Sequence, residues 1–394
     1  MEISYFIREK QISNYETFKN ILESTPFNLK VKEDVDYPNL FLICNQSEII
    51  SPSESEIQQF LPHNIMNIIR ECNGLIMEKD TFKIICYTFN KCLEDSSLDE
   101  SLDTDNLYVE PALEGTLMRL YYYNNKWNIS TKKCIDANKS KWLSEKSFYD
   151  LFLECLGNYN IDENLITTNC YSFILTHPEN NIVIKYSNPQ LYHISTRDLL
   201  NFNEIDATIG IVKLNRQSVE KEYLPILIGQ LLNDSNLSYE GYILIDTKYN
   251  RQKLKTFIYK KARDIWGNTN NRFMRFLELR KDLNMLNEYL TYYPCDKDNF
   301  INYEDKISYL ANDILKYYML KHVNKENIKV PFYFSKIIYK LHGDFFKNRV
   351  KTDYNKIILT LLDLDPKKIC FICNHHDKSK LENVQNYTIT STTI

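Results

Sequence analysis

The residues of this sequence whose types and spacing suggest chemistry are two Glu-Gly pairs and two lysines. The chain has only 8 glycines in 394 residues, yet Glu-Gly occurs as Glu114–Gly115 and as Glu240–Gly241, each directly before a strand-like run. Lys253 and Lys255 follow the second pair, and their spacing of two places both on one face of a strand. Adjacent cations repel each other unless an anion lies beside them, so this spacing predicts a phosphate-binding face.

Nucleotidyl transfer is the chemistry that such a set of residues suits. It depends on positioning and on cations around the phosphate oxygens, which Lys253 and Lys255 would supply. The same charges would lower the pKa of a neighbouring lysine nucleophile. Glu114 and Glu240 would orient a divalent metal or a ribose, and Mg²⁺ prefers carboxylate and phosphate oxygens. The alternative for both lysines, considered without this context, is an ordinary solvated strand surface.

The order of these elements resembles the motif series of the covalent nucleotidyltransferases, which comprise DNA ligases, RNA ligases and mRNA capping enzymes. The series runs through Leu113–Thr116, then Glu240–Tyr242, then Lys253–Lys255 with Tyr259 four residues later. In that superfamily the first motif reads Lys-x-Asp/Glu-Gly, and its lysine attacks the nucleotide α-phosphate. The lysine position of this sequence holds Ala112.

Three further segments resemble the phage-type single-strand RNA ligases and their viral relatives. Glu71–Ile76 resembles a Glu-Cys-Arg-Gly-Ile element, Trp127–Ile135 resembles motif Ia, and Tyr171–Val183 resembles motif III with the turn after it. The match extends from about residue 70 to 260. The sequence departs from the family pattern at Asn73, where arginine is usual, and at Ile174, where glutamate is usual.

The resemblance implies an ATP-dependent RNA ligase that joins 5′-phosphate and 3′-hydroxyl RNA ends through lysyl-AMP and RNA-adenylate intermediates. ATP and Mg²⁺ would be its cofactors, and RNA with a 5′-phosphate or 5′-adenylated end its partner. The implied catalytic positions are Ala112 as the nucleophile position, Glu114, Glu240, Lys253 and Lys255. The implied nucleotide contacts are Glu110, Gly115, Asn73, Lys91, Lys132, Gly241 and Tyr259, and Glu240 would also bind the metal.

Ala112 removes the nucleophile that the first step of such a reaction needs. We interpret it as a lysine-to-alanine replacement in an otherwise intact ligase site. One alternative is a catalytically dead protein that binds nucleotides or RNA ends. Another is a relative of the DNA ligases or capping guanylyltransferases. Those enzymes normally append a five-stranded barrel after the last shared motif, whereas the segment after Tyr259 has helical spacing.

Hydrophobic periodicity predicts an α+β chain. Short alternating and β-branched runs extend to about residue 266 and indicate antiparallel sheets with flanking helices. Farther along, residues such as Ile307, Leu310 and Ile314 recur at helical spacing. We therefore expect an adenylyltransferase domain over 1–268, an all-helical domain over 269–376 and a polar tail over 377–394.

Composition limits the remaining possibilities. The net charge of −4 provides no overall basic excess, so a polyanion site must be local. No apolar run is long enough to span a bilayer, and ten scattered cysteines are typical of reduced thiols, so we expect a cytoplasmic protein without a membrane partner. Cys370–His376 contains two cysteines and two histidines, but it lacks the second half of a zinc site, and we interpret these cysteines as buried small residues.

Overall fold

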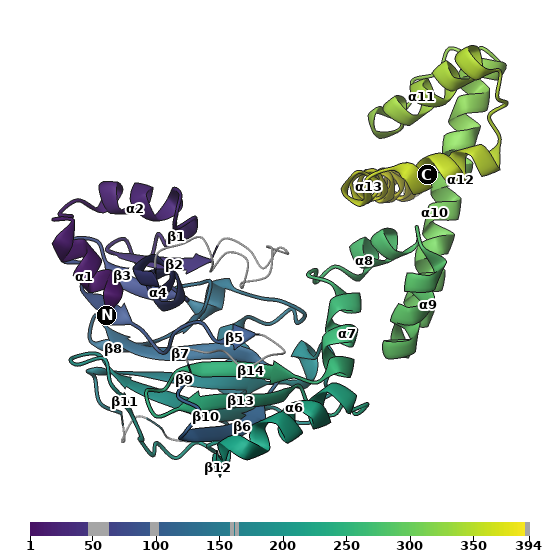
Figure 1. The fold of residues 1–394 in the computed structure, drawn as a ribbon. Coiled ribbons are helices and arrows are strands. Elements are labelled where there is room, and N and C mark those ends of the chain that lie inside the picture. The colour runs from purple at the N-terminus through teal and green to yellow at the C-terminus, as the bar shows by residue number, and fades with distance from the viewer. Residues whose placement is uncertain (46–62, 95–101, 158–160, 162–164, 391–394) are drawn as a thin grey trace. The chain divides into compact units, whose positions relative to one another are not determined.

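The computed structural model describes residues 1–45, 63–94, 102–157, 161 and 165–390 (Figure 1). The chain divides into two compact units, Met1–Arg263 and Asp264–Ile394. The first unit contains mainly antiparallel sheets with flanking helices, and the described part of the second unit is helical. The predicted α+β class, with a helical region after the sheets, is confirmed.

A four-stranded sheet with the order β1-β2-β3-β4 forms one part of the first unit. Its inner face packs against three amphipathic helices through residues such as Phe18, Phe41 and Met77, which are all fully buried. Asn14 caps the second of these helices by accepting from the backbone of Thr17. The strands are β1 (Leu29–Glu33), β2 (Leu40–Asn45), β3 (Leu75–Glu78) and β4 (Ile84–Cys86), and the helices are α1 (Glu2–Glu9), α2 (Tyr15–Glu23) and α4 (His63–Glu71).

A second sheet has the order β11-β10-β9-β7-β8. Helix α5 (Phe148–Leu156) packs on it through Phe152, which contacts Phe173, and begins with a capping box between Ser147 and Asp150. The strands are β7 (Thr116–Tyr123), β8 (Lys126–Thr131), β9 (Asn169–Thr176), β10 (Gln190–Asp198) and β11 (Glu204–Ile205), and short 3₁₀ turns lie at Ala137–Lys139 and Pro178–Asn180.

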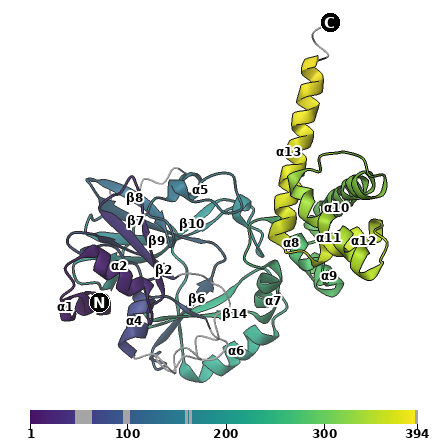
Figure 2. The ribbon, with the colours of Figure 1, turned by 90° about the horizontal axis from the view of Figure 1, so that it is seen from above.

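A third sheet has the order β12-β6-β13-β14-β5, with β5 parallel to β14. One face is apolar, since Leu107, Leu244 and Leu254 pack against helix α6, which lies alongside β14 and β6 in Figure 2. Because successive strand residues point to opposite faces of a sheet, the residues next to these leucines lie on the other face. The elements are β5 (Leu93–Glu94), β6 (Leu107–Ala112), β12 (Gln217–Val219), a 3₁₀ turn (Lys221–Tyr223), α6 (Leu224–Asn233), β13 (Gly241–Asp246), β14 (Arg251–Lys255) and α7 (Phe257–Trp266).

The second unit is built around buried helix faces. Ile307, Leu310 and Ile314 are fully buried on one helix, as their spacing predicts. Residues 377–390 of the segment predicted as a polar tail continue the last helix. The elements are α8 (Arg272–Leu279), α9 (Leu283–Tyr292), a 3₁₀ turn (Pro294–Asp296), α10 (Lys297–Tyr318), a π-helical turn (Met319–Val323), α11 (Phe332–Asn348), α12 (Tyr354–Asp363) and α13 (Pro366–Thr390).

None of the described helices combines the length and the apolar character that crossing a bilayer requires. Cys370 and Cys373 lie in α13, where Cys373 is 1% exposed. His376 contacts Asp313 rather than either cysteine, at 2.7 Å. Cys373 is therefore a buried small residue as interpreted, whereas Cys370 is only partly buried.

Candidate functional site

Three neighbouring strands bring the separated motifs side by side. Gly241 on β13 pairs with Ala112 on β6 and, on its other side, with Lys255 on β14. One step along, Ile243 pairs with Glu110 and Lys253. Directly paired residues of antiparallel strands project to the same face. Ala112, Lys255, Glu110 and Lys253 therefore share the face opposite α6, and we call this set the strand-end face.

Gly241 occupies a position that no other residue tolerates. Its φ is +147°, and a Cβ atom there would lie 2.0 Å from the backbone oxygen of Leu254. The middle residue of the row between Ala112 and Lys255 therefore carries no side chain. Because Ala112 contributes only a methyl group, the row has one long side chain, that of Lys255.

Glu240 lies close to both predicted lysines. Its Oε1 atom lies 3.1 Å from Nζ of Lys253 and 3.9 Å from Nζ of Lys255. The carboxylate is 5% exposed, whereas the lysine side chains are 20% and 23% exposed. A phosphate arriving from solvent can thus reach both ammonium groups, which the shared carboxylate keeps close together.

Glu114, two residues after Ala112, anchors a neighbouring segment. Its carboxylate accepts hydrogen bonds from the backbone nitrogens of Val183 (2.9 Å) and Ile184 (2.7 Å) and from the hydroxyl of Tyr259 (2.9 Å). Burial raises the pKa of Glu114, and these hydrogen bonds oppose that shift. The predicted residues Glu114 and Tyr259 are thus joined directly, and together they fix the segment after β9 beside the end of β6.

Gly115 allows β9 to approach this strand end. A Cβ atom at this position would lie 2.6 Å from both the backbone oxygen of Leu175 and a methyl group of Ile174. Ile174, where the family pattern has glutamate, therefore packs directly over Gly115.

Glu110 is almost completely buried on the strand-end face. It is 3% exposed, and its Oε2 atom lies 3.4 Å from Arg216, a residue that the sequence analysis missed. Its Oε1 atom has no hydrogen-bond partner within the described part of the chain. Burial raises the pKa of Glu110, and the charges of Arg216 and Arg251 oppose this. A buried carboxylate oxygen without a donor suits a ligand that brings one.

Arg119, which the sequence analysis also missed, holds together the segments that contain Asn73 and Lys132. This fully buried arginine on β7 donates to the backbone oxygens of Gly74 and Thr131, the neighbours of Asn73 and Lys132. Gly74 has φ +86°, and a Cβ atom there would lie 2.8 Å from the backbone oxygen of Lys132. The Nδ2 atom of Asn73 is buried without a hydrogen-bond partner among the described residues.

Lys91 lies in the connection between β4 and β5. Its backbone nitrogen donates to the oxygen of Arg70 at 2.8 Å. Two residues later, Leu93 pairs with Gln252 of β14. The structure therefore places the backbone that follows Lys91 beside the strand that carries Lys253.

Outside this set, one group of side chains has the composition of a metal site. Oxygen and nitrogen atoms of Glu154, His177 and Glu179 lie within 4.8 Å of one another. The ammonium of Lys146 already binds both glutamates, at 2.9 and 2.6 Å. His177 accepts a hydrogen bond from the backbone nitrogen of Glu179 and so stabilises the turn after β9. A lysine thus supplies the positive charge that a metal would bring.

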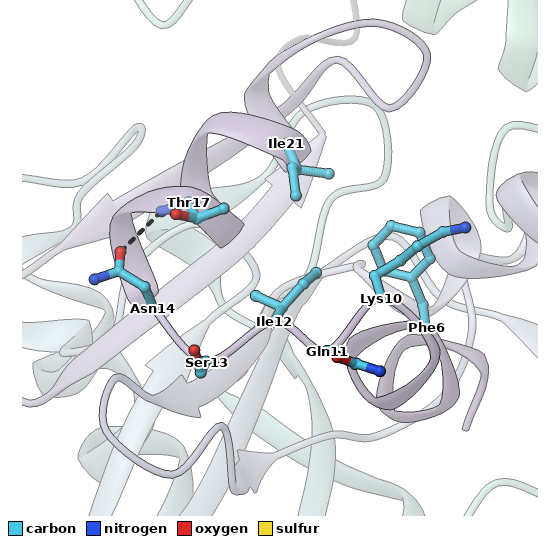
Figure 3. Close-up of a pocket in the computed structure, with 8 residues that line it drawn as sticks. All are labelled: Phe6, Lys10, Gln11, Ile12, Ser13, Asn14, Thr17 and Ile21. Carbon is cyan, nitrogen blue, oxygen red and sulfur yellow. Dashed lines mark hydrogen bonds between the residues drawn. The ribbon is translucent and has the colours of Figure 1, made fainter.

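A hollow of about 410 Å³ lies at the N-terminal helices and does not include the predicted site residues (Figure 3). Phe6, Ile12 and Ile21 form its apolar part. Asn14 at its edge caps α2, so its polar group already has a structural role.

Sequence comparison relates the chain to viral proteins. It is 23% identical over 368 residues to the "Immediate-early protein ICP-46 homolog" of Invertebrate iridescent virus 6, covering 80% of this chain and 78% of that protein. It is 24% identical over 151 residues to the "Putative bifunctional polynucleotide kinase/RNA ligase" of Autographa californica nuclear polyhedrosis virus, covering 33% of this chain and 22% of that protein. No protein-family model matches the chain.

Among solved structures, similar chains include ATP-dependent ligases. A putative ATP-dependent DNA ligase from Aquifex aeolicus has a TM-score of 0.40 at 14% identity, covering 84% of this chain and 80% of that one. An archaeal ATP-dependent RNA ligase has a TM-score of 0.37 at 12% identity, covering 77% and 69%. Similarity at this level carries no argument about function, which has to rest on the site itself.

Proposed function

We propose that the chain is an RNA ligase of the ATP-dependent nucleotidyltransferase class in a form that lacks its lysine nucleophile. The observation that carries the proposal is the row of Ala112, Gly241 and Lys255 across three strands. Ala112 and Gly241 are 129 residues apart in sequence, yet they pair on one sheet, and Lys255 completes the row that a nucleophile, a central glycine and a phosphate-binding lysine would form.

The residues of the strand-end face take the following roles. Lys253 and Lys255 bind the α-phosphate and neutralise the charge that develops during transfer. Glu114 acts with Tyr259 to hold the segment that contains Val183 and Ile184 in place. Gly115 and Gly241 permit the close backbone approaches described above.

ATP and Mg²⁺ are the cofactors of this proposal, and the side chains fit them. The partly exposed lysines suit phosphate. The buried Glu110 oxygen and Asn73 amide, each without a hydrogen-bond partner among the described residues, suit the polar groups of a nucleoside. Lys91 and Lys132 are further candidates for nucleotide contacts. Mg²⁺ needs only one or two carboxylates in addition to phosphates and water, and Glu240 is the candidate ligand. The metal would neutralise phosphate charge when bound.

The absence of an amine at position 112 restricts the reaction. Ala112 cannot form a covalent bond to AMP, so the protein cannot adenylylate itself at this position. The final step needs only an RNA whose 5′ end already carries AMP and a second RNA with a 3′-hydroxyl. In that step the hydroxyl oxygen forms a bond to the 5′-phosphorus and AMP departs. The proposed activity of the chain is this joining reaction.

Restoring the nucleophile tests the proposed class. We expect Ala112→Lys to become labelled by α-labelled ATP with Mg²⁺, because its amine would lie beside the phosphate-binding lysines. Ala112→Arg is the matched control, since it has similar length and charge but stays protonated. Thermal unfolding of both variants checks that the buried position accepts them. A folded Ala112→Lys protein that binds ATP without labelling would contradict the ligase proposal.

The same assay separates the alternatives. Preferential labelling by GTP would assign the protein to the capping enzymes, and joining of DNA ends alone would assign it to the DNA ligases. A protein that binds nucleotide but neither labels after Ala112→Lys nor joins pre-adenylated RNA is a binding protein with a naturally altered site.

A further inference from the structure

Two cysteines from different sheets meet in the core of the first unit. The sulfur atoms of Cys86, at the end of β4, and Cys170, on β9, lie 3.2 Å apart, and both residues are 0% exposed. They are 84 residues apart in sequence. They belong to one apolar cluster between the four-stranded sheet and the sheet that contains β9. Neither residue takes part in the proposed ligase site.

Contacts on both sides of the two thiols hold them in this arrangement. Arg197 is the cross-strand partner of Cys170 and donates to the backbone oxygen of Thr88, two residues after Cys86, at 2.6 Å. Arg119 ties the turn before β3 to β8 through Gly74 and Thr131. These contacts hold in place the backbone segments that carry the two cysteines.

The two thiols have different acid strengths. Burial acts to raise the pKa of Cys86, but the hydrogen bond from Cys170 and the charge of Arg119 outweigh it and lower this pKa to about 7. Burial raises the pKa of Cys170, and its position as the donor to Cys86 raises it further. Cys86 is thus the nucleophilic thiolate of the pair, and Cys170 is the thiol that can resolve its oxidised form.

We propose that Cys86 and Cys170 are a redox modification site, at which a hydroperoxide oxidises the pair to a disulfide that links the two sheets. The Cys86 thiolate attacks one oxygen of hydrogen peroxide, the O–O bond breaks, and the departing hydroxide takes a proton to become water. The Cys170 sulfur then attacks the sulfenic sulfur of Cys86 and displaces its oxygen as a second water. Two thiols lose two electrons in total, and one peroxide is reduced to two waters.

The buried position decides which oxidant and which effect to expect. Because both thiols are 0% exposed, the expected oxidant is a small uncharged hydroperoxide rather than a bulky disulfide reagent. The new bond closes a loop of more than eighty residues and restricts the unfolded chain. Oxidation should therefore raise the melting temperature of the first unit by about 5 °C or more, and a reducing agent should reverse the rise.

The test uses the full chain. Protein is treated with hydrogen peroxide, its remaining thiols are blocked in denaturant, and peptides are mapped by mass spectrometry with and without dithiothreitol. We expect a reducible peptide that links Cys86 to Cys170, together with the rise in melting temperature. Cys86→Ser and Cys170→Ser should lose both effects. Cys155→Ser is the matched control, because Cys155 is also buried but donates to a backbone oxygen, and it should retain both.

The peptide map of the unaltered chain is decisive, since it requires no variant to fold. Recovery of both cysteines as blocked thiols, while the exposed Cys295 is oxidised, would overturn the proposal. A Cys86–Cys170 link that forms equally well when peroxide is added in denaturant would also overturn it, because the folded arrangement would then have no role. Nucleotide binding and RNA joining do not enter this test.

Discussion

The two ends of β14 carry similar charges in different surroundings. At one end, Arg251 is 2% exposed and forms an ion pair through both terminal nitrogens with Glu204, which is 3% exposed. At the other end, Lys253 and Lys255 are 20% and 23% exposed and share one oxygen of Glu240. All three cations have the same spacing of two along the strand. The spacing therefore predicts a cationic face, and only burial separates the structural cation from those that a ligand can reach.

The buried end connects two sheets. Glu204 lies on β11 and also binds Arg197 of β10 at 3.1 Å, so one carboxylate ties both strands to β14. The guanidinium of Arg251 lies 4.6 Å from the ring centre of Phe89. This network positions the sheet that carries the lysines, and the lysines themselves remain at its accessible end.

The largest expected effect comes from a substitution that breaks the ion pairs of Glu204 at the buried end of β14. Glu204→Gln should lower the free energy of unfolding by about 3–5 kcal/mol, because it leaves buried guanidinium groups without a compensating charge. Chemical denaturation monitored by circular dichroism measures the change. Glu33→Gln is the control, since Glu33 is 39% exposed and pairs with Lys19 and Lys79 at the surface. This control substitution should lower the free energy of unfolding by at most about 1 kcal/mol. Equal costs would contradict the assigned difference between buried and exposed pairs.

A buried histidine on β10, His193, should make the first unit sensitive to acid. Burial and the charge of Lys213 lower the pKa of His193 to about 4. A folded-state pKa below the ordinary value of about 6.5 gives stability that is present above pH 6.5 and lost as the pH falls through 4. The loss should reach about 3 kcal/mol.

The matched variant for this prediction is His193→Gln, which does not titrate. The difference in unfolding free energy between the unaltered chain and this variant should shrink between pH 6.5 and 4, as measured by denaturant titrations across that range. A difference that is independent of pH would show that His193 ionises normally in the folded state.

Substitutions at the exposed end of β14 should affect activity more than stability. In the Ala112→Lys background, Lys253→Ala or Lys255→Ala should reduce adenylylation by about a hundredfold or more, since each removes a fixed charge from the transferring phosphate. Each change leaves the buried Glu240 with its other lysine, so the free energy of unfolding should fall by about 1–2 kcal/mol, less than for Glu204→Gln. Arginine should restore only part of the rate, because its planar group does not reproduce a compact ammonium. Full rates in both alanine variants would make these ordinary surface lysines.

The smallest effect is expected from loss of the hydrogen bond between Tyr259 and Glu114. Tyr259→Phe removes the hydroxyl that donates to Glu114 and should cost about 1–2 kcal/mol, because a buried carboxylate loses one of its donors. Tyr108→Phe is the control, since Tyr108 is 41% exposed and should change stability by less than about 0.5 kcal/mol. Equal effects of the two changes on thermal unfolding would contradict the anchoring role.

The sequence allowed the α+β class and the shared strand face of Lys253 and Lys255 to be predicted, because both follow from local periodicity. The buried face of α10 could be predicted for the same reason. The row that joins Ala112, Gly241 and Lys255 depends on strand pairing between distant segments, and periodicity carries no information on pairing. The resemblance to the ligase motifs gave the order of these segments along the chain, but not the register in which their strands pair.

The buried arginines were harder to recognise. Arg251 has the same spacing as the two lysines, and this pattern offered a signal that the sequence analysis did not use. Arg119 and Arg216 lie among residues that offer no such signal. Arg119 donates to backbone oxygens of the turn at Gly74 and of β8, and Arg216 pairs with a carboxylate on β6. Long-range contacts of this kind become visible only after folding.

The most direct test of the central claim is joining of RNA by the chain as it stands. An RNA with a 5′-adenylated end is mixed with a labelled acceptor that has a 3′-hydroxyl, in the presence of Mg²⁺, and products are separated by gel electrophoresis. We predict a longer labelled product from pre-adenylated RNA and none from 5′-phosphate RNA with ATP, because Ala112 blocks only the step that needs an amine. A protein that binds AMP but leaves the acceptor unjoined with both RNAs would contradict the account.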